Sequence, residues 1–169
     1  MQLTPATEKD LQAIRRWYEE PELNRLLSVD PPVGGEKIVY VIRDGPDALG
    51  WCELFNIDWK NRTAEGGIAI PDPRGRGFAL VAGLRFLKQA FEIFDLIRIR
   101  VLEHNTHALK CAEAFGFLLE GRETRDDGNV IVQMSMDKQR FYERHGHRLG
   151  KKVMCDGGKR NVQGPARPA

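Results

Sequence analysis

The stretch GGIAIPDPRGRGFAL, residues 66–80, connects a strand-like run to a helix-like run through a turn rich in glycine and arginine. The run GGIAI is expected to end a strand at Ile70, because Pro71 cannot donate a ladder hydrogen bond. The helix expected over residues 78–94 is apolar on more than half of its circumference, which predicts that it packs against a sheet. The first turn of such a helix presents unpaired, partly positive backbone N–H groups, and glycines let a ligand approach them closely. The stretch therefore predicts an anion site between a strand and a long helix.

Two common phosphate-binding loops do not fit this turn. The Walker loop ends in Gly-Lys-Ser/Thr, which is absent here. The dinucleotide-binding fingerprint needs G-x-G-x-x-G in a parallel βαβ unit near the start of the fold. Here the spacing is G-x-G-x-A, and three strands with antiparallel character precede it. A tight turn whose arginines are solvated is the alternative interpretation of the same residues.

Length and composition describe one globular domain and exclude several classes of protein. The chain has 169 residues, of which 41% are hydrophobic and 30% are charged, a soluble globular profile. Its longest apolar-rich stretch is interrupted by charged side chains, and its first residues lack the regions of a signal peptide, so no membrane segment is expected. The three cysteines are odd in number and far apart, which argues against a disulfide framework and for a reducing, cytoplasmic location.

Periodicity predicts one mixed α/β domain over residues 1–137 with the element order β-α-β-β-β-α-β-α-β-β. The helices are expected at residues 7–19, 78–94 and 105–114, and the main strands at 38–43, 48–57, 62–70, 96–102, 115–123 and 129–136.

Residues 138–169 are interpreted as a basic, partly disordered tail, because they carry nine Lys/Arg and two acidic residues. The tail charge has three interpretations: solvated charge, contact with RNA or another polyanion, or docking onto the body or another protein.

Several motifs in one order resemble the GNAT acetyltransferase superfamily, and the resemblance covers residues 3–136. The pattern R-x-x-G-x-A at residues 74–79 is similar to its acyl-CoA signature. The other motifs are Thr7-x-x-Asp10, Ala64-Glu65, Asn105-x-x-Ala108 and Phe115-Gly116-Phe117. The whole resembles the RimJ/RimL-like branch most, and residues 56–70 also resemble polyamine and amino-sugar N-acetyltransferases of the superfamily.

The resemblance implies a GNAT-type, mostly antiparallel mixed sheet (α/β or α+β) that is flanked by helices and splays beside the strand ending at Ile70. Acetyl-CoA would be the co-substrate, with its thioester in the gap. Asn105 matches an asparagine that binds the pantetheine arm, although it also suits a helix N-cap. Backbone amides of Arg74, Gly75, Arg76, Gly77, Phe78 and Ala79 would bind the CoA pyrophosphate, and the pantetheine would pair with Ile68, Ala69 and Ile70.

The implied chemistry is attack of an amine on a thioester. An alkyl amine has a pKa of about 10.4, so it arrives protonated and must lose a proton first. Glu65 occupies the position of a glutamate that removes this proton in several members, often through water. The alternative is that Glu65 faces solvent or pairs with Arg62. Glu53, on the neighbouring strand, is the second catalytic candidate.

One position departs from the resemblance. The tyrosine that protonates the CoA thiolate in some members would fall at Ala112, and RimJ/RimL-like members often lack it. Cys111 adjoins the position, but a cysteine on an apolar helix face is usually a core residue. No metal site is expected, because the pairs His104/His107 and His145/His147 have no complete ligand set nearby.

These patterns predict an acetyl-CoA-dependent N-acetyltransferase that transfers the acetyl group directly to a primary amine. The acceptor is a small-molecule amine, such as an amino sugar or a polyamine, or a protein or peptide N-terminus, and the protein is a monomer or homodimer. The acceptor pocket is expected between residues 19–35 and the last hairpin. The first of these segments carries acidic side chains at Glu19, Glu20, Glu22 and Asp30. The alternative is a GNAT-fold protein that binds CoA or a partner without turnover.

Overall fold

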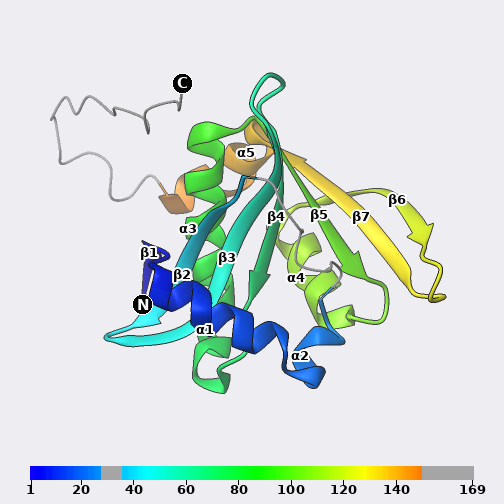
Figure 1. Ribbon diagram of the computed structural model, residues 1–169. Coiled ribbons are helices and arrows are strands. Elements are labelled where there is room, and N and C mark those ends of the chain that lie inside the picture. The colour runs from blue at the N-terminus through cyan, green and yellow to red at the C-terminus, as the bar shows by residue number, and fades with distance from the viewer. Residues whose placement is uncertain (28–35, 150–169) are drawn as a thin grey trace, which may run out of the picture.

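The computed structural model describes residues 1–27 and 36–149, and Figure 1 shows a single twisted sheet with helices on both faces. The seven strands have the order β1-β2-β3-β4-β5-β7-β6. The strands are β1 (Gln2–Pro5), β2 (Ile38–Asp44), β3 (Asp47–Asp58), β4 (Thr63–Ala69), β5 (Leu96–Leu102), β6 (Leu118–Thr124) and β7 (Val130–Asp137). The helices are α1 (Glu8–Tyr18), α2 (Pro21–Asn24), the 3₁₀ helix η1 (Pro73–Phe78), α3 (Ala79–Ile93), α4 (Thr106–Phe115) and α5 (Lys138–Leu149).

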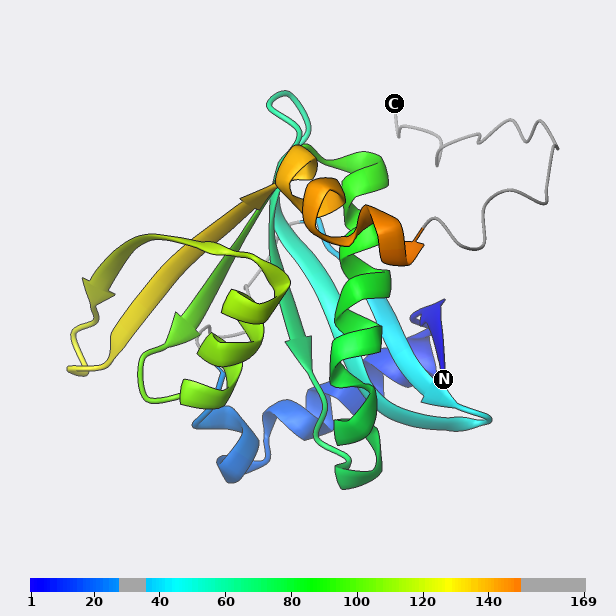
Figure 2. The ribbon, with the colours of Figure 1, turned by 180° about the vertical axis from the view of Figure 1, so that it is seen from behind.

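The sheet is antiparallel except where β4 meets β5. These two strands pair in parallel only from Thr63 to Glu65 against Leu96 to Arg98, and in the described residues no ladder pair follows. Beyond Glu65 the two strands diverge, as Figures 1 and 2 show. The mixed, mostly antiparallel sheet flanked by helices confirms the predicted fold class.

Helix α1 lies on one face of the sheet, whereas α3, α4 and α5 lie on the other (Figures 1 and 2). On the first face, Ile14 of α1 packs with Trp51 and Ala69. On the second face, α3 buries most of its apolar side, including Phe86 and Phe91, in the main core. This burial agrees with the apolar circumference of the helix, because only an element covered along its length can hide so many apolar side chains.

Helix α1 begins with a capping box, as the Thr7-x-x-Asp10 pattern indicates. The backbone N–H of Thr7 donates to the Asp10 carboxylate over 2.8 Å, and Arg43 of β2 also donates to that carboxylate. Burial alone would raise the pKa of Asp10, but the hydrogen bonds from Thr7 and Arg43 outweigh it and lower the pKa. The cap therefore also attaches α1 to the outer strands.

The first part of the expected basic tail, Lys138–Leu149, is not a tail but forms helix α5. Its Phe141 is fully buried, with its ring 5.0 Å from that of Phe91 on α3. His145, one turn further on, is also buried, and its Nε2 lies 2.7 Å from the carbonyl oxygen of Phe115. This i, i+4 pair joins the helix to the core. The remainder of the expected tail, residues 150–169, lies outside the described residues.

Candidate functional site

The divergence of β4 and β5 leaves a backbone edge and an apolar surface uncovered. Ile68 is opposite Cys52 of β3, yet its side chain is 42% exposed while Cys52 is fully buried. Leu80 and Val81, in the first turn of α3, are also exposed. Exposed apolar side chains beside an unpaired strand edge are typical of a surface that binds an extended ligand. The expected pantetheine residues Ile68 and Ala69 belong to this part of β4, and Ile70 follows it directly.

The RGRGFA turn is folded as the 3₁₀ helix η1, which continues into α3 at Ala79. The N-cap residue of α3 is Phe78, and no side chain caps that helix end. The two glycines of the turn differ. A Cβ at Gly75 would lie 2.5 Å from Ile70 Cγ2, whereas a Cβ at Gly77 would meet nothing within 4 Å. Gly75 therefore permits close packing under the turn, and Gly77 faces open space.

Arg74 is held by two acidic side chains. Its guanidinium donates to Asp72 over 2.7 Å and to Asp47 at the start of β3 over 2.9 Å. These hydrogen bonds raise the pKa of Arg74, and the pKa of Asp72 is lowered by the same contact. Arg74 therefore anchors η1 to β3 and brings no excess positive charge to the turn. The side chain of Arg76 lies outside the described part of the structure.

Asn105 is the N-cap of α4, one of the two roles expected for it. Its Oδ1 accepts from the backbone N–H of Ala108 over 3.2 Å, and its Nδ2 donates to the carbonyl oxygen of Leu26 over 3.2 Å. His104 Nε2 lies 3.1 Å from the carbonyl oxygen of Arg25. The segment after α2 is therefore joined to the start of α4, at the end where β4 and β5 separate (Figures 1 and 2).

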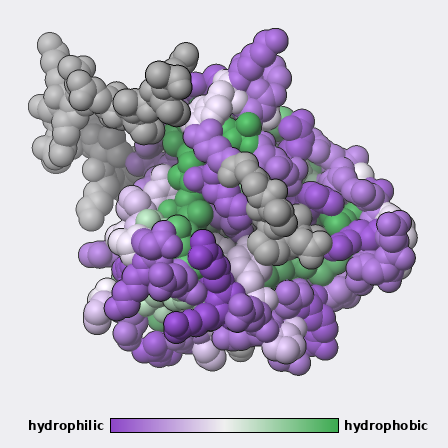
Figure 3. All heavy atoms as spheres, in the orientation of Figure 1, coloured by the Kyte–Doolittle hydropathy of each residue, from purple (hydrophilic) through white to green (hydrophobic). Residues whose placement is uncertain are grey.

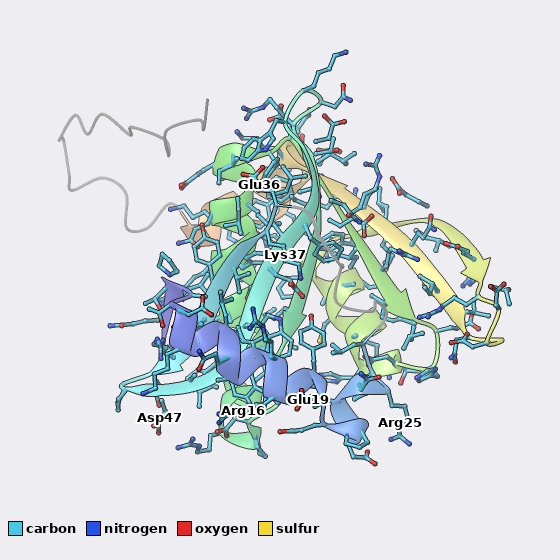
Figure 4. The ribbon with its side chains drawn as sticks, in the orientation of Figure 1. Arg16, Glu19, Arg25, Glu36, Lys37 and Asp47 are labelled. Atoms are coloured by element: carbon cyan, nitrogen blue, oxygen red, sulfur yellow. The ribbon has the colours of Figure 1, made fainter. Side chains whose placement is uncertain are left out.

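Glu53 lies on the α1 face of the sheet and is fully engaged. It is 6% exposed and accepts from the hydroxyl of Tyr18 over 2.6 Å. Its other oxygen lies 3.2 Å from Nζ of Lys37, which Figure 4 shows over the middle of the sheet. Burial and then the Glu53 carboxylate raise the pKa of Tyr18, so this hydroxyl remains a hydrogen-bond donor. The contacts attach α1 and the start of β2 to β3.

Glu65 has a different environment on the same face. It faces Phe55 across the β3–β4 ladder and Arg98 across the short β4–β5 ladder. Its Oε2 is buried and has no hydrogen-bond partner among the described residues. The alternative pairing with Arg62 is not formed, because Arg62 binds Asp95 over 2.7 Å. A buried carboxylate oxygen without a donor is costly in a folded chain, so it is a candidate for a group that binds a ligand.

Glu65 lines a cavity of about 270 Å³ on the open face of β5, β7 and β6. The other lining residues are Arg98, Ile99, Arg100, Glu120, Glu123 and Gln133. None of these lining residues belongs to a motif that predicts a site from the sequence. The available signal was the alternation in LIRIRVL, which places Arg98 and Arg100 on one face of a strand.

The residues considered for thiolate protonation, cysteine chemistry or metal binding do not line this cavity. Ala112, at the position of the family tyrosine, is buried in α4 and carries no polar group. Cys52 and Cys111 are free thiols, and burial raises the pKa of Cys52. Across residues 1–27 and 36–149, no cluster of three His, Cys, Asp or Glu side chains is arranged to hold a metal ion. No helix in these ranges has both the length and the apolar run needed to cross a bilayer.

Comparisons with known proteins agree with this geometry. The family model of the acetyltransferase (GNAT) domain matches residues 1–118. Spermidine N-acetyltransferase from Vibrio cholerae, solved with CoA and spermine, superposes with a TM-score of 0.74 at 21% identity, over 83% of this chain and 96% of that one. A dodecameric structure of spermidine N-acetyltransferase from Vibrio cholerae superposes with a TM-score of 0.68 at 25% identity, over 85% and 96% of the chains. No curated protein matches the chain. Since the family model spans well over half of the sequence, the chain belongs to the GNAT acetyltransferase family.

Proposed function

We propose that this acetyltransferase uses acetyl-CoA and transfers the acetyl group directly to a primary amine, with Glu65 as the general base. The observation that carries the proposal is the buried Oε2 of Glu65, which has no donor among the described residues and lies beside a cavity. A protonated amine would supply the hydrogen-bond donor that this oxygen lacks. The alkyl amine, with a pKa of about 10.4, would give its proton to Glu65 before it attacks.

The residues around the β4–β5 opening suit a CoA molecule. The exposed Ile68 supports binding of the pantetheine along the free edge of β4, because an extended arm can pair with an unpaired strand. The open space at Gly77 and the uncapped start of α3 at Ala79 support binding of the pyrophosphate by backbone amides. Bound acetyl-CoA supplies the activated acyl group.

Glu53 is the weaker of the two catalytic candidates. One of its oxygens accepts from Tyr18 and the other is paired with Lys37, so neither is free to receive a proton from a substrate. We propose that Glu53 positions α1 over the sheet. Ala112 brings no hydroxyl to α4, so we propose that solvent protonates the departing thiolate.

The acceptor is proposed as a primary amine of a protein N-terminus, an amino sugar or a polyamine. The two similar structures are spermidine N-acetyltransferases, and one of them holds spermine, so a polyamine is one of the acceptors to be tested. Glu22, from the acidic segment expected to attract a cation, is already paired with Arg25, and residues 28–35 lie outside the described residues.

Thiol release tests the proposal. Wild-type protein is incubated with acetyl-CoA and a panel of amines, and the CoA thiol is measured, with CoA binding followed by calorimetry. Glu65→Gln is expected to lower kcat by about 100-fold or more at unchanged CoA affinity. Glu92→Gln, on the exposed side of α3, is the matched control and keeps wild-type kcat. An unchanged kcat in Glu65→Gln would remove Glu65 from the mechanism. Binding of CoA without thiol release for any amine would favour the non-catalytic alternative.

A further inference from the structure

Two arginines lie beside the proposed base in the same cavity. Arg98 faces Glu65 directly in the β4–β5 ladder, and Arg100 follows two residues later on β5. Side chains at i and i+2 of a strand project from the same face, so all three groups lie on one side of the sheet. All three also line the 270 Å³ cavity. The side chains of Arg98 and Arg100 are 45% and 28% exposed, so both are accessible to a ligand.

The arginines are held in place by carboxylates from the edge strand β6. Arg98 Nε lies 3.4 Å from Glu120, and the guanidinium of Arg100 lies 3.7 Å from Glu123. Gln133 donates to Glu123 over 3.0 Å and so fixes that carboxylate. Ion pairs of this length between partly exposed side chains are weak. An anionic group of a ligand could therefore share or replace them.

The cavity lining carries charges of both signs. It holds three carboxylates and two guanidinium groups. Ion pairs join Arg98 with Glu120 and Arg100 with Glu123, and Glu65 belongs to neither of these two pairs. An extended polycation would bring further ammonium groups close to Arg98 and Arg100, and like charges placed together oppose binding. A ligand with one amine and one anionic group meets opposite charge at both ends.

We propose that Arg98 and Arg100 form an anion-binding subsite of the acceptor pocket. The acceptor is then a primary amine that carries a carboxylate or a phosphate, with the amine at Glu65 and the anion on the guanidinium forks. Glu65 pairs with Arg98 across the ladder, where neighbouring strands lie about 4.8 Å apart, and Arg100 lies about 6.6 Å further along β5, so the three backbone positions lie within roughly 8 Å of one another. The inference rests on the proposed function, because it assigns a substrate class to the same site. In Figure 3 hydrophilic residues predominate on the β6–β7 side of this face, with hydrophobic patches between them.

Matched acceptor pairs test the subsite. The first pair is glucosamine 6-phosphate and glucosamine. The second is a tetrapeptide amide with aspartate at its second position and the same peptide with asparagine there. Spermidine is the polycationic acceptor. We measure kcat/KM by thiol release, and expect the anionic member of at least one pair to exceed its neutral partner by about tenfold or more. An advantage in the sugar pair assigns the anion as phosphate, and one in the peptide pair assigns it as carboxylate.

Substitution locates the effect. Arg98→Gln and Arg100→Gln are each expected to reduce the anionic advantage to less than about threefold. Arg122→Gln is the matched control, because Arg122 lies on the edge strand but pairs with Glu103 and does not line the cavity. Arg122→Gln is expected to keep the higher kcat/KM of the anionic acceptor.

The inference is overturned if neither pair shows an advantage, if spermidine is the best acceptor, or if the advantage persists in both cavity variants. Thiol release would continue in each of these cases. Its absence with every acceptor would instead be a failure of the proposed function.

Discussion

The sharpest prediction concerns the two glycines of η1, which the structure places in different surroundings. A Cβ at Gly77 meets no atom within 4 Å, so Gly77→Gln and Gly77→Glu are expected to fold with a free energy of unfolding within about 0.5 kcal/mol of wild type. A Cβ at Gly75 would lie 2.5 Å from Ile70 Cγ2 and 3.0 Å from Leu49 Cβ. Overpacking of this kind costs about 1–3 kcal/mol, so Gly75→Ala should unfold earlier.

For the affinity for CoA, we expect the larger loss at Gly77, where the expected effect on stability is the smaller one. If the pyrophosphate binds at the start of α3, the carboxylate of Gly77→Glu opposes its two negative charges at a few ångströms. Near a protein surface this repulsion amounts to about 2–4 kcal/mol, which weakens binding by about 30-fold to about 1,000-fold. Gly77→Gln has the same size without the charge, so comparing the two variants separates charge from bulk.

Calorimetric titration of CoA and thermal unfolding measure the two effects. A loss of 1 kcal/mol lowers Tm by about 2–4 °C in a chain of this size, so Gly75→Ala should be visible in a melting curve. The reasoning fails if Gly77→Glu binds CoA as tightly as Gly77→Gln does. It also fails if Gly77→Gln unfolds as early as Gly75→Ala, since the open space beside Gly77 would then not exist.

Two further predictions concern how the helices are attached. Phe141→Ala should lower the free energy of unfolding by about 3–5 kcal/mol in urea titrations, because Phe141 is fully buried. Its exposed neighbour gives the control variant Tyr142→Ala. If both variants lowered the free energy of unfolding by an equal, small amount, α5 would not belong to the folded core. Asp10→Asn weakens the capping box, in which Thr7 remains the N-cap, and removes the ion pair with Arg43, at a cost of about 2–4 kcal/mol at pH 7. Because the pKa of Asp10 is lowered by folding from 3.8, its contribution is present above that pH and is lost as the pH falls through the folded value. Urea titrations at pH 7 and pH 3 should therefore show a smaller difference between wild type and variant at pH 3; a constant difference, or a similar loss in the exposed control Glu8→Gln, would contradict this.

Local patterns predicted the helices α1, α3 and α4 and the strands from β2 to β7, because the causes of these elements lie close together in the chain. Alternation in LIRIRVL predicted a strand, and the structure places β5 at Leu96–Leu102. The capping box of α1 is local in the same sense, since its donor and acceptor are three residues apart. The cap role of Asn105 was one of two expected roles, and it too is a contact over three residues.

Contacts between distant segments could not be predicted in this way. Arg74 belongs to the glycine-rich turn, but its guanidinium is bound by Asp47, which is 27 residues away. Asn105 binds the carbonyl oxygen of Leu26, which is 79 residues away. Helix α5 has few apolar residues, so composition alone did not indicate that Phe141 is covered by α3.

The sequence by itself determined the GNAT-type order of elements and the glycine-rich turn before the long helix, because periodicity and proline or glycine positions act over a few residues. It also indicated Glu65 as the first catalytic candidate and Glu53 as the second. Only the tertiary structure decided their surroundings, since Tyr18 and Lys37 reach Glu53 from other elements while Glu65 keeps an oxygen without a donor in the described part of the chain. The physical reason is that solvation and hydrogen-bond partners depend on which segments meet in space, and strand pairing decides that.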